Sequence, residues 1–103
     1  MNLTLTGRHF EITPHLKAHV DEKIRRLEKF GEQIIESEIV LFKESVRDVA
    51  EGKVHLSHTV LAAKGTGDDM YMAVNDVVDK LVAQLHRYEG KLHDRKRHPV
   101  ENQ

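Results

Sequence analysis

The stretch that decides the fold is residues 69–95, DMYMAVNDVVDKLVAQLHRYEGKLHDR. Apolar side chains recur along it at steps of three or four residues, and two further valines widen the apolar face. These side chains are Met70, Val74, Val77, Val78, Leu81, Val82, Leu85, Tyr88 and Leu92. Because one helical turn takes 3.6 residues, this spacing predicts a long amphipathic helix over about 69–95. Such a helix must lay its apolar face on another layer, which the rest of the chain has to supply.

Short alternating segments upstream of this helix predict strands. Residues 2–6 (NLTLT) alternate between leucine and a polar residue, and residues 34–42 (IIESEIVLF) are rich in β-branched and aliphatic side chains. A third strand is expected around Val54 and Leu56, followed by a turn near Ser57-His58 and a fourth strand over 59–64. The polar segment 44–52 has no clear period and is expected to be a loop.

A second helix is predicted between the first two strands. Thr13 can cap the free N–H groups of a helix, and Pro14 suits the first helical position. Apolar side chains then recur at helical spacing up to Phe30-Gly31, which predicts a helix over about 14–30. The Gly65–Asp69 segment is expected to break the chain before the long C-terminal helix and to cap that helix.

The order of these elements is βαβββα, which predicts an α+β fold: a four-stranded mixed sheet with both helices packed on one face. With 103 residues the chain is long enough for one domain. We expect this domain to span residues 1–95, with residues 96–103 forming a flexible tail, first basic and then polar.

Composition excludes several classes of site. The chain has no cysteine, so disulfides, thiolate nucleophiles and iron–sulfur clusters are excluded. It has no apolar run near the roughly 20 residues of a membrane span and no hydrophobic leader, so we expect a soluble, cytoplasmic protein without a membrane partner. No recognisable nucleophile motif is present, so we expect no enzyme activity, no cofactor and no small-molecule substrate.

The formal net charge of −1 argues at first against a nucleic-acid partner. That total is a cancellation between segments. Residues 31–51 carry a charge of −4, residues 68–79 another −4, and residues 80–98 a charge of +4. The placement of the charges is therefore more informative than their sum.

Basic and polar side chains form one stripe on the flank of each predicted helix. We define the first stripe as His15, His19, Lys23 and Arg26, and the second stripe as Lys80, Gln84, Arg87, Lys91 and Arg95. Both are offset in the same sense from the apolar faces, which is typical of a footprint for phosphates. With 5% aromatic residues, base stacking is disfavoured, so contact with RNA backbone phosphates is the favoured interpretation. A solvated charged surface is the alternative.

A metal site is the weaker interpretation of the histidines. His15 and His19 lie four residues apart, with Glu22 as a third ligand, but Lys23 and Arg26 place positive charge on the same face. We therefore expect no functional metal site there.

Two blocks of the sequence resemble the ribosome hibernation-promoting factor family, also called the ribosome-associated inhibitor or sigma-factor-modulation family. The resemblance covers about residues 2–92. The first block is Thr6-Gly7, Glu11-Ile12-Thr13, Leu16, Val20, Lys23 and Leu27-Glu28-Lys29-Phe30; the second is Asp69-Met70-Tyr71, Ala73-Val74, Asp79-Lys80-Leu81 and Gln84-Leu85. The family has the same βαβββα fold.

The resemblance implies a stress-phase regulator that binds the small ribosomal subunit in the channel used by messenger and transfer RNA, and so inhibits translation by occlusion. Basic side chains of both helices contact ribosomal RNA in this family. The matching positions are Lys23, Arg26, Lys80, Arg87 and Lys91, with Gln84 as a polar neighbour and Arg95 beyond them. The chain departs from the family pattern at Ala83 and at Glu89-Gly90, where Gly90 favours fraying or a bend.

Two further expectations concern protein partners. The alternative function is a protein-interaction module that modulates transcription through the acidic surface of residues 31–51. Any homodimer is expected to be weak and to form through an exposed sheet edge.

Overall fold

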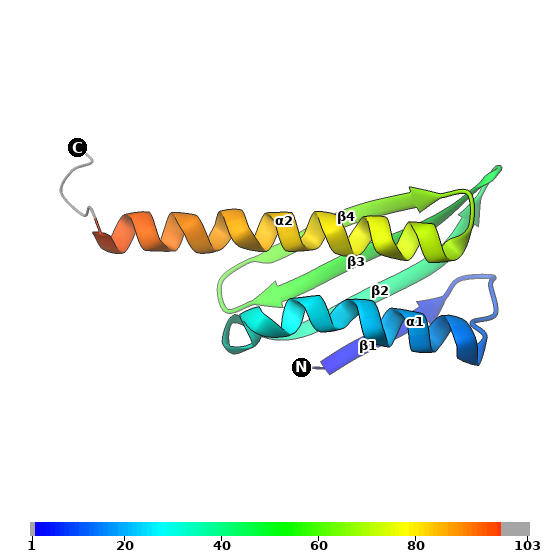
Figure 1. The fold of residues 1–103 in the computed structure, drawn as a ribbon, viewed down its shortest axis with the longest axis horizontal. Coiled ribbons are helices and arrows are strands. Elements are labelled where there is room, and N and C mark those ends of the chain that lie inside the picture. Colours follow the sequence, from blue (N-terminus) through cyan, green and yellow to red (C-terminus); the bar gives the residue numbers. More distant parts are fainter. Residues whose placement is uncertain (1, 98–103) are drawn as a thin grey trace.

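The computed structural model describes the backbone of residues 2–97 and the side chains of residues 2–90, and it has the predicted βαβββα order (Figure 1). A 3₁₀ helix, η1, follows the first α-helix directly. The elements in chain order are β1 (Asn2–Gly7), α1 (Pro14–Ile24), η1 (Arg25–Gln33), β2 (Ile34–Glu44), β3 (Arg47–Leu56), β4 (Val60–Gly67) and α2 (Met70–Arg97).

The four strands form one mixed sheet in the spatial order β1-β2-β3-β4. β1 pairs with β2 in parallel through the α1 crossover, and the other two pairs are antiparallel hairpins. Both helices lie on the same face of the sheet and run in the same direction (Figure 1). The predicted fold class is therefore confirmed.

The prediction of a loop over residues 44–52 is wrong. The chain reverses at Ser45-Val46, where Ser45 has a φ of 54°, and β3 begins at Arg47. The sequence pattern did not indicate this strand because its helix-facing positions include small residues, Ala50 and Gly52, both buried. A Cβ on Gly52 would lie 2.8 Å from Leu81 Cδ1, so α2 packs directly on the backbone there. The alternation is present, but it lacks the large apolar side chains that make a strand visible in a sequence.

The break predicted at Gly65 is also wrong, because β4 continues to Gly67. A Cβ on Gly65 would lie 2.3 Å from the Val77 backbone nitrogen and 2.5 Å from the Ala73 carbonyl oxygen. Glycine is needed here because the backbone of α2 approaches the strand closely, and not because the chain turns.

The first helix begins as predicted and ends earlier. Thr13 Oγ1 accepts a hydrogen bond from the Leu16 backbone N–H at 3.1 Å, and Pro14 occupies the first turn. The α-helix ends at Ile24, and the predicted remainder to residue 30 belongs to the 3₁₀ helix η1. Phe30 leaves helical geometry at φ −104° and ψ 18°, and its buried ring closes the core at this end.

The apolar face predicted for the long helix lies in the core. Its members from Met70 to Leu85 are buried, and Tyr88 is half-buried. Asp69 caps the helix: its carboxylate accepts the Met72 N–H at 2.9 Å. The helix continues through Gly90 to Arg97, and residues 98–103 of the predicted tail lie outside the described residues. Over the part of the chain described, no helix is long and apolar enough to cross a membrane.

Candidate nucleic-acid interface

α1 and α2 run in the same direction (Figure 1). Because both stripes are offset in the same sense from the apolar faces, they lie on the same side of their helices and do not face each other. His15, His19 and Arg26 of the first stripe contact side chains of α2 on its flank toward α1. Lys80 and Gln84 of the second stripe bond to β4 from the opposite flank of α2. The described members of the two stripes are separated by the outward crest of α2, and their contact with RNA stays a prediction. Met72 and Ala83 lie on this crest and are exposed.

The first stripe is mostly engaged with α2. His15 Nδ1 and the Tyr71 hydroxyl form a hydrogen bond of 2.9 Å, and His19 Nε2 bonds Asn75 Oδ1 at 2.8 Å. The two histidines have different hydrogen-bond partners, and their ring nitrogens do not belong to a group of possible metal ligands among the described residues. The metal site considered for His15 and His19 is therefore not assembled among the described residues.

The two basic members of the first stripe, Lys23 and Arg26, differ in whether they form an ion pair. Arg26 Nη1 forms an ion pair with Asp79 on α2, and both side chains are about half-exposed. Lys23 is half-buried and has no ion-pair partner in the part of the chain described. Of the two cations predicted on this helix, Lys23 is thus the one free to meet an anion.

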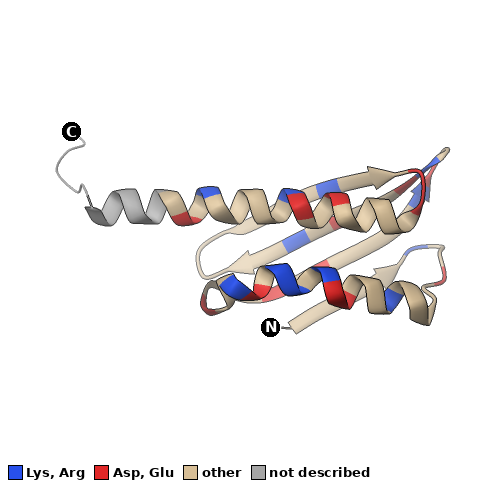
Figure 2. Cartoon of the chain, in the orientation of Figure 1, with Lys and Arg blue, Asp and Glu red and all other residues tan. Residues whose placement is uncertain are grey.

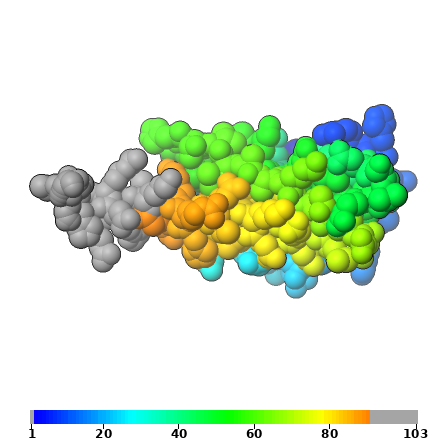
Figure 3. Space-filling model, turned by 90° about the horizontal axis from the view of Figure 1, so that it is seen from above, coloured from blue at the N-terminus to red at the C-terminus, as the bar shows by residue number. Residues whose placement is uncertain are grey.

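Two members of the second stripe form hydrogen bonds with the backbone of β4, the edge strand of the sheet. Lys80 Nζ donates to the Lys64 carbonyl oxygen at 2.9 Å, and Gln84 Nε2 donates to the Ala62 carbonyl oxygen at 2.7 Å. Both acceptors point outward from β4, where a fifth strand would otherwise pair. Figure 3 shows α2, in yellow and orange, packed along this edge.

Asp76 extends this row of edge contacts by one turn. Its carboxylate accepts the Thr66 backbone N–H at 3.0 Å and pairs with Lys80 at 3.2 Å. The Thr66 N–H, followed by the hydrogen bond and charge of Lys80, lowers the pKa of Asp76 despite an opposing contribution from burial. We call Asp76, Lys80 and Gln84 the edge caps.

Among the members of the second stripe whose side chains are described, Arg87 is the one without a partner. It is exposed, has no ion-pair partner among the described residues, and lines a shallow depression with Thr59, Leu61, Gln84 and Tyr88. Lys91 and Arg95 lie on the helical backbone of α2, but their side chains are outside the described residues.

Two cations of the same region were missed by the sequence analysis. Arg25 and Lys29 are exposed on η1, and Figure 2 shows Lys and Arg gathering at this end of the first helical segment. The Arg25-Arg26 pair was the available signal. An α-helical projection to residue 30 places Arg25 away from the stripe, and the change to 3₁₀ geometry after Ile24 invalidates that projection.

The acidic segment 31–51 does not form one open acidic surface. Its acids are distributed over η1, β2 and β3, and four of them pair with a lysine, arginine or histidine. The pairs are Glu38–His55, Glu44–Lys64, Asp48–Lys43 and Glu51–Arg8. The three pairs with lysine or arginine reduce the local negative charge on which the alternative function depends.

Known proteins are similar to this chain in sequence and in fold. A family model described as Sigma 54 modulation protein / S30EA ribosomal protein matches residues 3–93. The ribosome hibernation promoting factor of Klebsiella oxytoca is 37% identical over 92 residues, covering 89% of this chain and 97% of that protein. The ribosome-associated factor Y of Haemophilus influenzae is 33% identical over 96 residues, covering 93% of this chain and 90% of that protein.

Solved structures also resemble this chain in fold. A ribosomal subunit interface protein from Coxiella burnetii superposes with a TM-score of 0.82 at 26% identity, covering 87% of this chain and 99% of that one. The N-terminal domain of Protein Y from Thermus thermophilus gives a TM-score of 0.77 at 29% identity, covering 85% and 99%. The two motif blocks, the fold and the match over residues 3–93 all lead to one conclusion: the chain belongs to the Sigma 54 modulation protein / S30EA ribosomal protein family.

Proposed function

We propose that this protein is a cytoplasmic, non-enzymatic ribosome hibernation factor. It binds the small ribosomal subunit in the channel for messenger and transfer RNA and inhibits translation by occlusion during stress or stationary phase. The observation that carries the proposal is the chain's likeness, over most of its length, to proteins named as ribosome hibernation promoting factors. The fold is also that of a ribosomal subunit interface protein.

The proposed contact surface is the outward side of the helix layer. Lys23 and Arg87 provide cations without described partners, and Lys91 and Arg95 extend the second stripe along α2. Such side chains suit backbone phosphates, which fix position without reading base sequence.

Arg26 and Lys80 can join this surface without large cost. Their ion pairs are solvent-exposed, with Arg26 48% and Lys80 51% exposed, and exposed pairs are worth only about 0.2–1 kcal/mol. Lys80 has three N–H donors, of which the Lys64 carbonyl and the Asp76 carboxylate use two. Its third donor is available to a phosphate, while Gln84 keeps its role at the strand edge.

The test is cosedimentation with small ribosomal subunits at several salt concentrations. We expect the double variant Lys23→Glu/Arg87→Glu to bind on the order of tenfold more weakly than the wild type. The slope of affinity against salt should decrease by about 1 for each phosphate that the variant no longer neutralises. These positions make no described ion pair, so the fold should be unaffected.

The matched control is Lys53→Glu. Lys53 is an exposed lysine on the opposite face of the sheet, so a single charge reversal there should leave binding nearly unchanged. Equal losses of affinity in the control and the double variant would contradict the proposed surface. Occlusion itself requires that subunits already loaded with messenger and transfer RNA bind the protein less well, and unchanged binding to them would contradict the channel assignment.

A further inference from the structure

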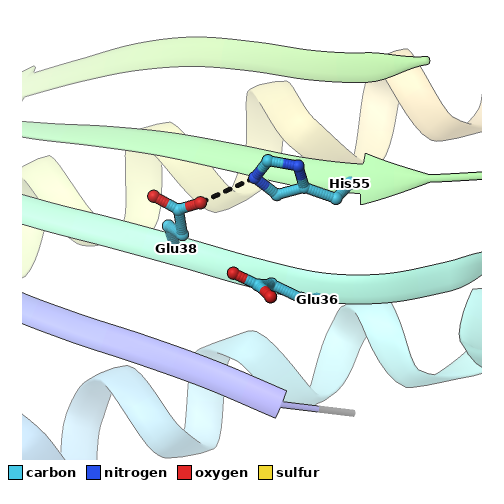
Figure 4. Close-up of side chains that lie close together, drawn as sticks. All are labelled: Glu36, Glu38 and His55. Carbon is cyan, nitrogen blue, oxygen red and sulfur yellow. Dashed lines mark hydrogen bonds and ion pairs between the residues drawn. The ribbon is translucent and has the colours of Figure 1, made fainter.

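We propose that Glu36, Glu38 and His55 form a binding site for a divalent transition metal, with Zn²⁺ the best-suited ion. The site lies on the sheet face that the helices leave uncovered, so it does not depend on the proposed RNA contacts. Glu36 and Glu38 project from β2 and His55 from the neighbouring β3 (Figure 4).

The three side chains converge at one point of the sheet. Their ligand atoms, one from each residue, all lie within 4.8 Å of one another, and His55 Nε2 donates to Glu38 Oε2 at 2.6 Å. Glu36 stands opposite His55 in the strand register, with Glu38 two residues along the same face. All three residues are half-buried.

A break in the strand register creates this arrangement. The β2–β3 pairing shifts between Ile34 and Glu36. A regular ladder continued from Ile34 opposite Leu56 would place Ile35 opposite His55; the shift places Glu36 there instead. Bulges of this kind re-aim side chains and are over-represented near functional sites.

The charges around the cluster favour a cation. Glu36 has no ion pair or hydrogen-bond partner among the described residues, although its carboxylate lies beside that of Glu38. Lys53 stands directly opposite Glu38 in the register, yet Glu38 is bonded to His55. Two neighbouring carboxylates repel each other, and a divalent ion bound between them removes that repulsion.

The donor set discriminates between metals. One imidazole nitrogen and two carboxylate oxygens suit Zn²⁺, which takes three protein ligands and leaves a fourth position to water or to another ligand. Mg²⁺ and Ca²⁺ prefer all-oxygen sites with more ligands, so they should bind much less well. β2 and β3 are the two inner strands of the sheet, which gives the ligands a rigid support.

The test is isothermal titration of the full chain with Zn²⁺ and, separately, with Mg²⁺. We expect one Zn²⁺ per chain for the wild type, and a loss of affinity of at least about tenfold for Glu36→Gln and for His55→Gln. Zn²⁺ should also raise the thermal midpoint of the wild type more than that of Glu36→Gln, since a ligand that binds only the folded state stabilises it. Glu36→Gln leaves the bond between His55 and Glu38 in place, so folding of this variant is not at risk.

The matched control is His58→Gln, because His58 is an exposed histidine three positions from His55 with no described partner. It should bind Zn²⁺ as the wild type does. If His58→Gln loses as much affinity as His55→Gln, or if Glu36→Gln loses none, the ion binds surface histidines in general and the site is refuted. The seven other histidines of the chain make this control necessary.

Discussion

The two flanks of α2 differ in what they contact. On the flank toward α1, Tyr71, Asn75 and Asp79 meet side chains of the first stripe. On the flank toward β4, the edge caps Asp76, Lys80 and Gln84 meet backbone groups of the strand. Each set recurs every four residues, so each follows one side of the helix.

This difference separates interactions that can be exchanged from interactions that hold the fold. A side-chain pair at the surface can be given up to water or to a phosphate at little cost. The backbone groups of an edge strand are also a template for pairing with another chain, and the edge caps occupy part of it. Sequence alone treats Arg26 and Lys80 as equivalent stripe members, but only Lys80 also bonds a backbone group.

The largest expected effect comes from forcing α2 away from β4. In Gly65→Ala the new methyl group would lie 2.3 Å from the Val77 nitrogen, and because the obstacle is helix backbone it cannot rotate away. We expect a loss of unfolding free energy of about 2–3 kcal/mol or more, measured by urea denaturation.

Gly90→Ala is the control for this substitution. Apart from its own stretch of helix, a Cβ built at Gly90 meets nothing within 4 Å among the described residues, and the position is helical, so the change should stabilise the protein by about 0.5–1 kcal/mol. A Gly65→Ala variant as stable as the wild type would show that α2 is not held close to the strand.

A smaller effect, with a pH signature, is expected from removing one edge cap. Asp76→Asn keeps an acceptor for the Thr66 N–H but loses the charge that strengthens this bond and attracts Lys80. We expect the free energy of unfolding at pH 7 to fall by only about 1 kcal/mol, because Asp76 is partly exposed. Urea denaturation measures this loss.

The pH dependence follows from the lowered pKa of Asp76 in the folded state. Its stabilising contribution is complete above the unfolded pKa, about 3.9, and is lost as the pH falls through the folded pKa. The difference in stability between wild type and Asp76→Asn should therefore shrink as the pH is lowered below about 4. A difference that stays constant to pH 2.5 or below, roughly, would contradict this assignment.

The fold was predictable where large apolar side chains recur at helical spacing. The apolar side chains spaced three or four residues apart from Met70 to Leu85 predicted α2, and Thr13-Pro14 predicted the start of α1. Prediction failed where packing depends on the absence of a side chain. Gly52 and Gly65 lie under α2 within strands, and a sequence pattern cannot distinguish them from glycines in turns.

The candidate interface was predictable only as a set of cations on two helix flanks. Which of them are already engaged depends on neighbours more than ten residues away in sequence, such as Asp79 for Arg26 and Lys64 for Lys80. The edge caps also depend on β4 being the last strand of the sheet, which the order of elements does not state. Whether the stripes contact RNA stays a prediction.

The smallest expected effect on stability belongs to the flank toward α1. A double-mutant cycle of Arg26→Gln and Asp79→Asn should give a coupling energy of about 0.2–1 kcal/mol that decreases with added salt, because both side chains are exposed. Asp79→Asn alone frees the Arg26 charge and removes an anion from the flank of α2 toward α1, so under the proposed function it should tighten binding to small subunits on the order of twofold. A coupling above roughly 2 kcal/mol would mean that this flank also holds the fold, and the two sides of α2 would then no longer differ in this respect.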